Sequence, residues 1–129
     1  MNNEEIIRRL YEAFAQGDVP AVLARFSDNI VWHEAEGTPY GGVYEGGNAI
    51  VQNVFMKLAT EWTGYTVTTE EFHDAGPTVV VLGRYSGRFN ATGKDMSVPF
   101  CHVWTLEDGV VVRFIQFTDT LLMARALEA

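Results

Sequence analysis

The sequence predicts one α+β domain in which helices lead and a mostly antiparallel sheet follows. Three observations support this prediction. Apolar residues recur at intervals of three and four near the start of the chain, which is typical of amphipathic helices. Strand-like runs separated by turn residues fill residues 65–118. A short apolar segment with helical spacing follows the last run, and this order is typical of helices packed on one face of a sheet.

Length and composition indicate a single domain and exclude several functions. A chain of 129 residues is long enough to bury one hydrophobic core, so residues 1–129 are expected to form a single domain. Nine basic against seventeen acidic side chains give a net charge of −8, which would repel nucleic acid. The single cysteine, Cys101, allows no internal disulfide. We therefore expect no nucleic-acid partner.

The sequence contains no membrane or secretion signal. Its longest apolar run, Val79 to Leu82, is far shorter than the roughly 20 residues that span a bilayer. The first residues lack the basic start and apolar centre of a signal peptide. A cytoplasmic protein without a membrane partner is the expectation.

Two helices are predicted at the N-terminus. The first runs from Asn3 to Gln16 and ends at Gly17, with its apolar residues on one side. Asp18 can cap a second, shorter helix, because its carboxylate accepts hydrogen bonds from free backbone amides. The apolar stripe of this second helix is Val22, Leu23 and Phe26.

The next segment combines a short strand, a loop and a third helix. Ser27-Asp28-Asn29 is expected to be a turn, and residues 30–33 a strand that places Trp32 and His33 on opposite sides. Residues 34–47 hold five of the twelve glycines and are expected to form the one long loop. A helix then runs from Gly47-Asn48 to about Thr60.

Four strands and a final helix complete the prediction. The strands cover residues 65–74, 78–90, 97–106 and 110–118, and the helix covers Thr120 to Leu127. A strongly bent sheet covered by three helices leaves an apolar hollow between the two layers. Such hollows are where small molecules bind.

Three polar groups lie in or beside apolar strands and are candidates for chemistry. His33 begins the stretch His33-Glu34-Ala35-Glu36, in which an imidazole or carboxylate can be aimed inward. His102 shares a strand face with Phe100 and Trp104. Asp119 follows the strongly hydrophobic last strand. A carboxylate in apolar surroundings has a raised pKa and can exchange a proton at neutral pH, while an imidazole can donate to a carbonyl oxygen.

Each candidate also has a structural interpretation, which the sequence leaves open. Asp119 is well placed to cap the terminal helix by accepting from amides near Leu121 and Leu122. His102 can be a core histidine bonded to the backbone, and His33 can face solvent at the end of its strand. No pair of candidate metal ligands has a familiar spacing, and no phosphate-binding motif is present, so no cofactor is expected.

The order and separation of several motifs resemble the SnoaL-like branch of the nuclear-transport-factor-2-like superfamily. The motifs are LYEAFAQGD at 10–18, LARFSDNIVW at 23–32, GVYEG at 42–46, and the stretch from His102 through Asp108-Gly109 to Asp119. The resemblance covers nearly the whole chain. It implies a cone-shaped barrel, in which a bent, mostly antiparallel sheet wraps around three helices of the N-terminal half, with a short C-terminal helix. It also implies a homodimer formed through the outer face of the sheet.

The resemblance further implies roles for the candidates. Asp119 matches the general base of the SnoaL-like polyketide cyclases, which close a ring by an intramolecular aldol reaction. His102 falls where the related ketosteroid isomerases keep an oxyanion-stabilising acid, and His33 falls near their catalytic aspartate. Their first-helix tyrosine aligns with Leu10, and Tyr11 is expected to turn about 100° away from that position. Ketosteroid isomerase activity is therefore not expected.

The leading hypothesis is a small cofactor-independent enzyme of the isomerase, cyclase or lyase type. It would use Asp119 as base, with His102 or His33 as hydrogen-bond donor, to remove a proton next to a carbonyl group of a small, largely apolar substrate. The alternative is a non-catalytic module with the same fold that binds a small molecule or forms a dimer. The aromatic residues expected to contact the ligand are Trp32, Tyr40, Tyr44, Phe100, Trp104 and Phe117.

Overall fold

The N-terminal helices form as the sequence predicts. The structure is a computed structural model that describes residues 1–129. Helix α1 spans Asn3–Ala15, and the side chain of Asn2 caps its first turn by accepting from the Glu5 amide. Helix α2 spans Val19–Leu23 and is capped by Asp18, whose carboxylate accepts from the Ala21 amide. The two predicted helices and the Asp18 cap are thus confirmed.

Strand β1, Phe26–Glu34, begins earlier than predicted. Phe26 was assigned to the second helix and residues 27–29 to a turn, and both assignments are wrong. The reason is tertiary: the Val111 amide donates to the Arg25 carbonyl, and Phe26 lies opposite Val111 on a neighbouring strand. A bulge between Phe26 and Val31 takes up the irregular 27–29 sequence.

The glycine-rich segment contains a strand as well as a loop. Strand β2, Gly42–Glu45, pairs antiparallel with β1, so that Tyr44 lies opposite Trp32. This strand was not predicted, because the glycines around it hide a pairing of only four residues. Gly46, at the end of β2, has a φ of +82°, a conformation that glycine adopts without strain. Its amide donates to the Ile30 carbonyl.

The third predicted helix is continuous but locally widened. It consists of α3, Gly47–Ile50, a π-helical turn η1, Val51–Phe55, and α4, Met56–Glu61. Single π turns inside α-helices frequently occur at functional sites. Here the turn contains Val54 and Phe55, two consecutive residues that both line the cavity described below.

The four predicted strands are confirmed, with small changes at the ends of three of them. They are β3, Trp62–Ala75; β4, Thr78–Phe89; β5, Asp95–Glu107; and β6, Val110–Thr118. Together with β1 and β2 they form one sheet in the order β2-β1-β6-β5-β4-β3, in which only β1 and β6 are parallel. The predicted terminal helix is α5, Thr120–Leu127.

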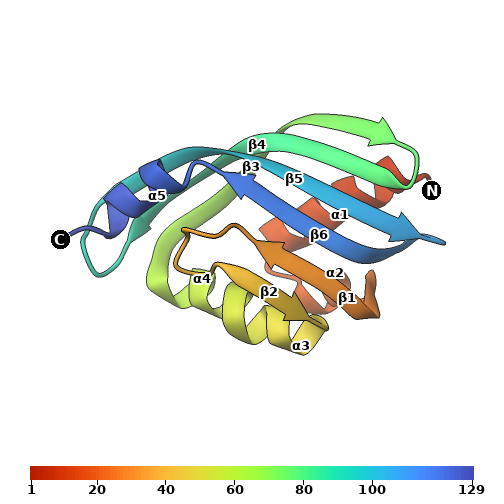
Figure 1. The fold of residues 1–129 in the computed structure, drawn as a ribbon, viewed down its shortest axis with the longest axis horizontal. Helices are drawn as coiled ribbons and strands as arrows, with labels where there is room; N and C mark the ends of the chain where they lie inside the picture. The colour runs from red at the N-terminus through yellow and green to blue at the C-terminus, as the bar shows by residue number, and fades with distance from the viewer.

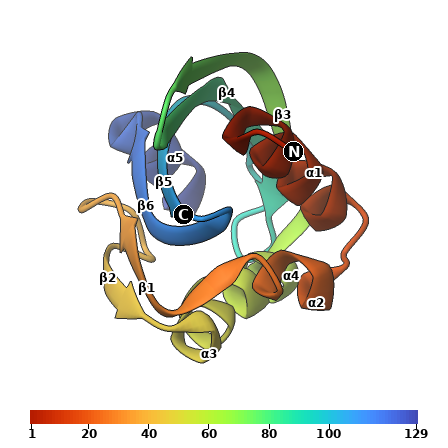
Figure 2. The ribbon, with the colours of Figure 1, turned by 90° about the vertical axis from the view of Figure 1, so that its right-hand side faces the viewer.

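The sheet is strongly curved and wraps around the helical layer. Figure 2 shows the sheet curling from β3 to β2, with α1 and α2 on the open side and α3 and α4 below. Figure 1 shows α5 at one end of the molecule, where it follows β6 and packs beside β5. Strands β2 and β3 are free edges, so the sheet resembles a barrel without closing. The predicted α+β class is therefore confirmed.

One hydrophobic core joins the two layers. It includes Ile7 from α1, Ile30 from β1, Val79 from β4 and Val111 from β6, all with no exposed surface. At about 25 cal/mol per Å² of buried apolar surface, this core is the main source of stability. None of the helices is long and apolar enough to cross a membrane.

Candidate active site

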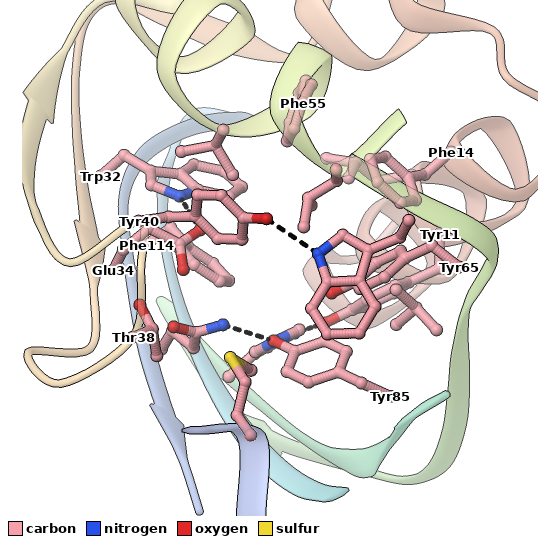
Figure 3. A pocket seen from close by; sticks show the side chains of 18 of the residues that line it. Tyr11, Phe14, Trp32, Glu34, Thr38, Tyr40, Phe55, Tyr65, Tyr85 and Phe114 are labelled. Atoms are coloured by element: carbon pink, nitrogen blue, oxygen red, sulfur yellow. Dashed lines mark hydrogen bonds between the residues drawn. The ribbon is translucent and has the colours of Figure 1, made fainter. Parts of the chain in front are cut away.

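A cavity lies between the curved sheet and the helices, with about 680 Å³ of empty space when its opening is included. Twenty residues line it, of which sixteen are hydrophobic, and no lysine or arginine is among them. Both layers contribute: Leu10 and Phe14 come from α1, and Trp104 and Phe114 from the sheet. Figure 3 shows the side chains around this cavity. The predicted apolar hollow therefore exists.

Strand β1 places a carboxyl group in the cavity. Because side chains alternate along a strand, Glu34 lies on the same inner face as Trp32. Trp32 Nε1 donates to Glu34 Oε1 at 2.9 Å, and this is the only side-chain hydrogen bond that Glu34 receives. Figure 3 shows the Glu34 carboxyl group pointing into the cavity. Its second oxygen is thus available to a ligand.

The surroundings of Glu34 tune its acidity. Only 7% of the residue is exposed. Burial disfavours the charged carboxylate and raises the pKa of Glu34 from 4.5 to about 7, although the hydrogen bond from Trp32 acts in the opposite direction. A carboxyl group with a pKa near 7 can both accept and return a proton at neutral pH.

A chain of hydrogen bonds centred on His102 forms another part of the wall. Tyr11 Oη lies 2.6 Å from His102 Nδ1, and Tyr85 Oη makes a hydrogen bond with His102 Nε2. The three residues come from α1, β4 and β5, so the chain links the helical layer to the sheet. Phe100 stacks on the imidazole with 3.9 Å between the ring centres.

His102 is neutral at physiological pH. The residue is 4% exposed, and burial lowers the pKa of its imidazole to about 3 because the charged ring is not solvated. Burial also raises the pKa of both tyrosine partners, so that Tyr11 and Tyr85 keep their protons. All three groups are therefore uncharged hydrogen-bonding groups. His102 is accordingly a hydrogen-bonded core histidine that also lines the cavity.

Fixed donors hold the two tyrosines. Trp104 Nε1 donates to Tyr11 Oη at 2.8 Å, and Gln116 Nε2 donates to Tyr85 Oη at 2.9 Å. The Gln116 amide is itself oriented, because its Oε1 accepts from the Ala35 amide at 3.0 Å. The expectation that Tyr11 turns away from the site is wrong. The inner face of α1 is wide enough for Leu10 and Tyr11 to line the cavity together.

Two further tyrosines differ in how their hydroxyl groups are used. Tyr40 Oη donates to Glu61 Oε1 at 2.7 Å and accepts from Trp62 Nε1 at 2.8 Å, so its proton is committed. Tyr65 also lines the cavity, but no side-chain hydrogen bond holds its hydroxyl group. Burial, and to a smaller extent the Glu34 carboxylate, raises the pKa of Tyr65. Its hydroxyl group is therefore a free donor in the cavity.

The structure separates the three predicted candidates for chemistry. His102 lines the cavity, whereas His33 and Asp119 do not. His33 alternates with Trp32 and Glu34 and so lies on the outer face of the sheet, opposite Val43 and Ile115. Asp119 caps α5, because its Oδ1 accepts from the Leu122 amide at 3.0 Å. No group of three His, Cys, Asp or Glu side chains is placed to hold a metal ion.

Of the six aromatic residues expected to contact the ligand, three line the cavity and three do not. Trp32, Tyr40 and Trp104 line the cavity. Phe100 lies behind His102, and Tyr44 donates from its hydroxyl group to the Tyr40 carbonyl at 2.6 Å. Phe117 is 56% exposed on the outer face of β6.

Sequence reasoning did not select several residues with polar groups in the cavity, among them Glu34, Tyr65 and Tyr85. A signal for Glu34 was present, since strand alternation from Trp32 selects Glu34 rather than His33. Tyr65 and Tyr85 had no local signal. Tyr85 lies opposite Val67 in the pairing of β3 and β4, and Tyr65 stacks on Tyr85 with 5.8 Å between their ring centres. Only the sheet register brings the two tyrosines together.

The fold and the cavity define an NTF2-like α+β domain, and comparisons with known proteins agree. An NTF2-like protein from Burkholderia thailandensis E264 is 41% identical, with a TM-score of 0.97 over 100% of this chain and 99% of that chain. An NTF2-like protein of unknown function from Burkholderia pseudomallei K96243 is 30% identical, with a TM-score of 0.91 and the same coverage of both chains. TerC, co-crystallised with polyporic acid, is 26% identical, with a TM-score of 0.87 over 98% of each chain.

Residues 7–114 match the SnoaL-like domain family, and the chain belongs to this family. Comparison with curated proteins gives no match. The family resemblance noted in the sequence is thus confirmed. The fold is compatible with an isomerase or cyclase that needs no cofactor, or with a binding module.

Substitution of Asp119 tests its capping role. We expect Asp119→Ala to lower the free energy of unfolding by about 1 kcal/mol, because the Leu122 amide loses its acceptor. Asp119→Asn should leave stability nearly unchanged, because asparagine caps helices as well as aspartate does. Urea denaturation measures both values. Equal losses for the two variants would contradict the capping role.

Substitution of Glu34 should change how stability depends on pH. The folded carboxyl group has a pKa near 7 and the unfolded one near 4.5, so ionisation favours unfolding as the pH rises between these values and the penalty is complete above pH 7. Glu34→Gln removes this penalty. At pH 8 we expect the free energy of unfolding of this variant to exceed that of the wild type by about 3 kcal/mol. At pH 4 the two proteins should have similar free energies of unfolding.

The control for this experiment is Glu36→Gln, which makes the same change at an exposed position two residues away. Its effect on unfolding should be small and similar at the two pH values. If Glu34→Gln also shifts stability equally at pH 4 and pH 8, Glu34 does not have a raised pKa in the folded protein.

Proposed function

We propose that the protein is a cofactor-independent enzyme that removes a proton from the carbon next to a carbonyl group, with Glu34 as the base. The observation that carries this proposal is a buried carboxyl group with a pKa of about 7 and one free oxygen in an otherwise apolar cavity. This acidity suits a base that works at neutral pH. The assignment replaces Asp119, whose carboxylate is committed to the cap of α5.

The proton transfer follows from the groups in the cavity. A carbon–hydrogen bond of the substrate breaks, and its proton forms an O–H bond on the free Glu34 oxygen. The electron pair moves onto the carbonyl oxygen, which accepts hydrogen bonds from uncharged donors such as the Tyr65 hydroxyl group. Return of the proton to another carbon gives an isomer. Alternatively, the enolate carbon attacks a second carbonyl carbon and closes a ring, and the oxygen of that carbonyl takes the proton back from Glu34 to become a hydroxyl group.

The lining indicates the class of substrate. Sixteen hydrophobic residues and the lack of lysine or arginine favour a small, largely apolar and uncharged molecule, because a carboxylate substrate would lose its solvation without gaining a positive partner. TerC, a relative in this fold, was crystallised with polyporic acid, which supports a small organic ligand here as well.

A binding module is the second candidate, and the position of Asp119 favours it. The residue that the family resemblance matches to a general base lies outside the cavity and accepts from a backbone amide. If Glu34 does not take over the role of base, the cavity binds an apolar carbonyl compound without changing it.

Hydrogen–deuterium exchange tests the proposal without knowledge of the natural substrate. The probe is 2-tetralone, a small apolar ketone, incubated with the protein in D₂O, and NMR follows the loss of its α-hydrogen signals. We expect the wild type to accelerate exchange and Glu34→Gln to lower the protein-catalysed rate by about 100-fold or more, as for loss of a general base. Glu36→Gln, the matched exposed control, should exchange at the wild-type rate.

The catalysed rate should rise with pH and level off above about pH 7, because only ionised Glu34 accepts a proton. Exchange that persists in Glu34→Gln would remove Glu34 from the mechanism. Wild-type protein that binds 2-tetralone, seen as broadening of its NMR signals, without accelerating exchange would support the binding module instead.

A further inference from the structure

The hydrogen atoms around His102 can be counted. Tyr11 and Tyr85 each carry one O–H hydrogen, and the neutral imidazole carries one N–H hydrogen. Each ring nitrogen faces one tyrosine oxygen, so these three hydrogens serve only two hydrogen bonds. One hydrogen is always left over.

The fixed donors decide where the spare hydrogen can lie. Each tyrosine oxygen already accepts one N–H, from Trp104 at Tyr11 and from Gln116 at Tyr85. A hydroxyl oxygen can accept two hydrogen bonds and donate one. Each tyrosine can therefore either donate to His102 or accept from it, and the tyrosine that accepts from His102 has its own O–H free.

Two arrangements satisfy all of these contacts. When Nε2 carries the hydrogen, it donates to Tyr85, Tyr11 donates to Nδ1, and the Tyr85 hydroxyl hydrogen is free. When Nδ1 carries the hydrogen, it donates to Tyr11, Tyr85 donates to Nε2, and the Tyr11 hydroxyl hydrogen is free. Both tyrosines line the cavity, so the spare hydrogen is offered to a ligand at one of two positions.

We propose that His102 is a positioning residue whose tautomer selects whether Tyr11 or Tyr85 donates a hydrogen bond to the bound ligand. A ligand oxygen beside Tyr85 selects the tautomer protonated at Nε2, and one beside Tyr11 selects the tautomer protonated at Nδ1, as expected for a ligand that shifts a pre-existing equilibrium. The site thus recognises an acceptor oxygen, as in a ketone or an enolate, at two alternative places. The importance of this choice for catalysis rests on the proposed function, but the existence of the two tautomers does not depend on it.

The variants Tyr11→Phe and Tyr85→Phe test this coupling without a ligand. Each removes the partner of one ring nitrogen. The imidazole hydrogen should then lie on the other nitrogen, because a buried N–H without an acceptor costs more than an unpaired nitrogen lone pair. We expect the His102 hydrogen to lie on Nε2 in Tyr11→Phe and on Nδ1 in Tyr85→Phe. Nitrogen NMR of ¹⁵N-histidine-labelled protein at pH 7 reads the tautomer directly, with His102 assigned from its loss in His102→Gln.

The matched control is Tyr65→Phe, which removes a cavity hydroxyl group that makes no hydrogen bond with His102. Its His102 spectrum should be that of the wild type. The same tautomer in Tyr11→Phe and Tyr85→Phe would overturn the proposal. A wild-type His102 with hydrogens on both nitrogens at pH 7 would overturn it as well, even if one variant fails to fold.

These outcomes are independent of turnover. A tautomer that switches in a protein without exchange activity leaves the inference intact and rejects the proposed function. Active protein in which the tautomer does not switch rejects only the inference.

Discussion

The cost of placing a negative charge in an apolar cavity governs this site. Glu34 has one side-chain donor, Trp32, and no positively charged side chain lines the cavity to offset the charge. The carboxyl group therefore holds its proton to a higher pH than in water. The raised pKa exists only because the curved sheet and the helices together exclude solvent from Glu34 at the end of β1. The fold contributes to the chemistry chiefly by keeping water away from one carboxyl group.

The same exclusion of water dictates how the other polar groups are arranged. Hydroxyl, amide and indole groups that are cut off from both solvent and the cavity must find partners, and every such fully buried side-chain nitrogen or oxygen atom has one. Trp104 and Gln116 hold Tyr11 and Tyr85 in place, and His102 joins the two without carrying charge. The few groups that remain uncommitted are the free oxygen of Glu34 and uncharged hydroxyl donors. This combination suits a neutral carbonyl compound better than a charged ligand.

Local patterns predicted most of the fold, because each helix and long strand carries its own periodicity. What they missed depended on pairing between distant segments. Phe26 joins β1 because β6 lies beside it, and the four-residue strand β2 forms because β1 offers a partner. For the site, alternation from Trp32 would have selected Glu34, although the sequence prediction chose His33. The positions of Tyr65 and Tyr85 follow from the register of β3 and β4, which single-strand patterns do not contain.

The central claim is that Glu34 titrates inside the cavity near neutral pH, and infrared spectroscopy tests it most directly. A protonated, buried carboxyl group has a C=O stretching band that disappears on ionisation. The difference between wild-type and Glu34→Gln spectra isolates this band from the other sixteen acidic side chains. The account predicts a band that is lost with a midpoint near pH 7. A midpoint near 4.5, the ordinary value, would contradict it.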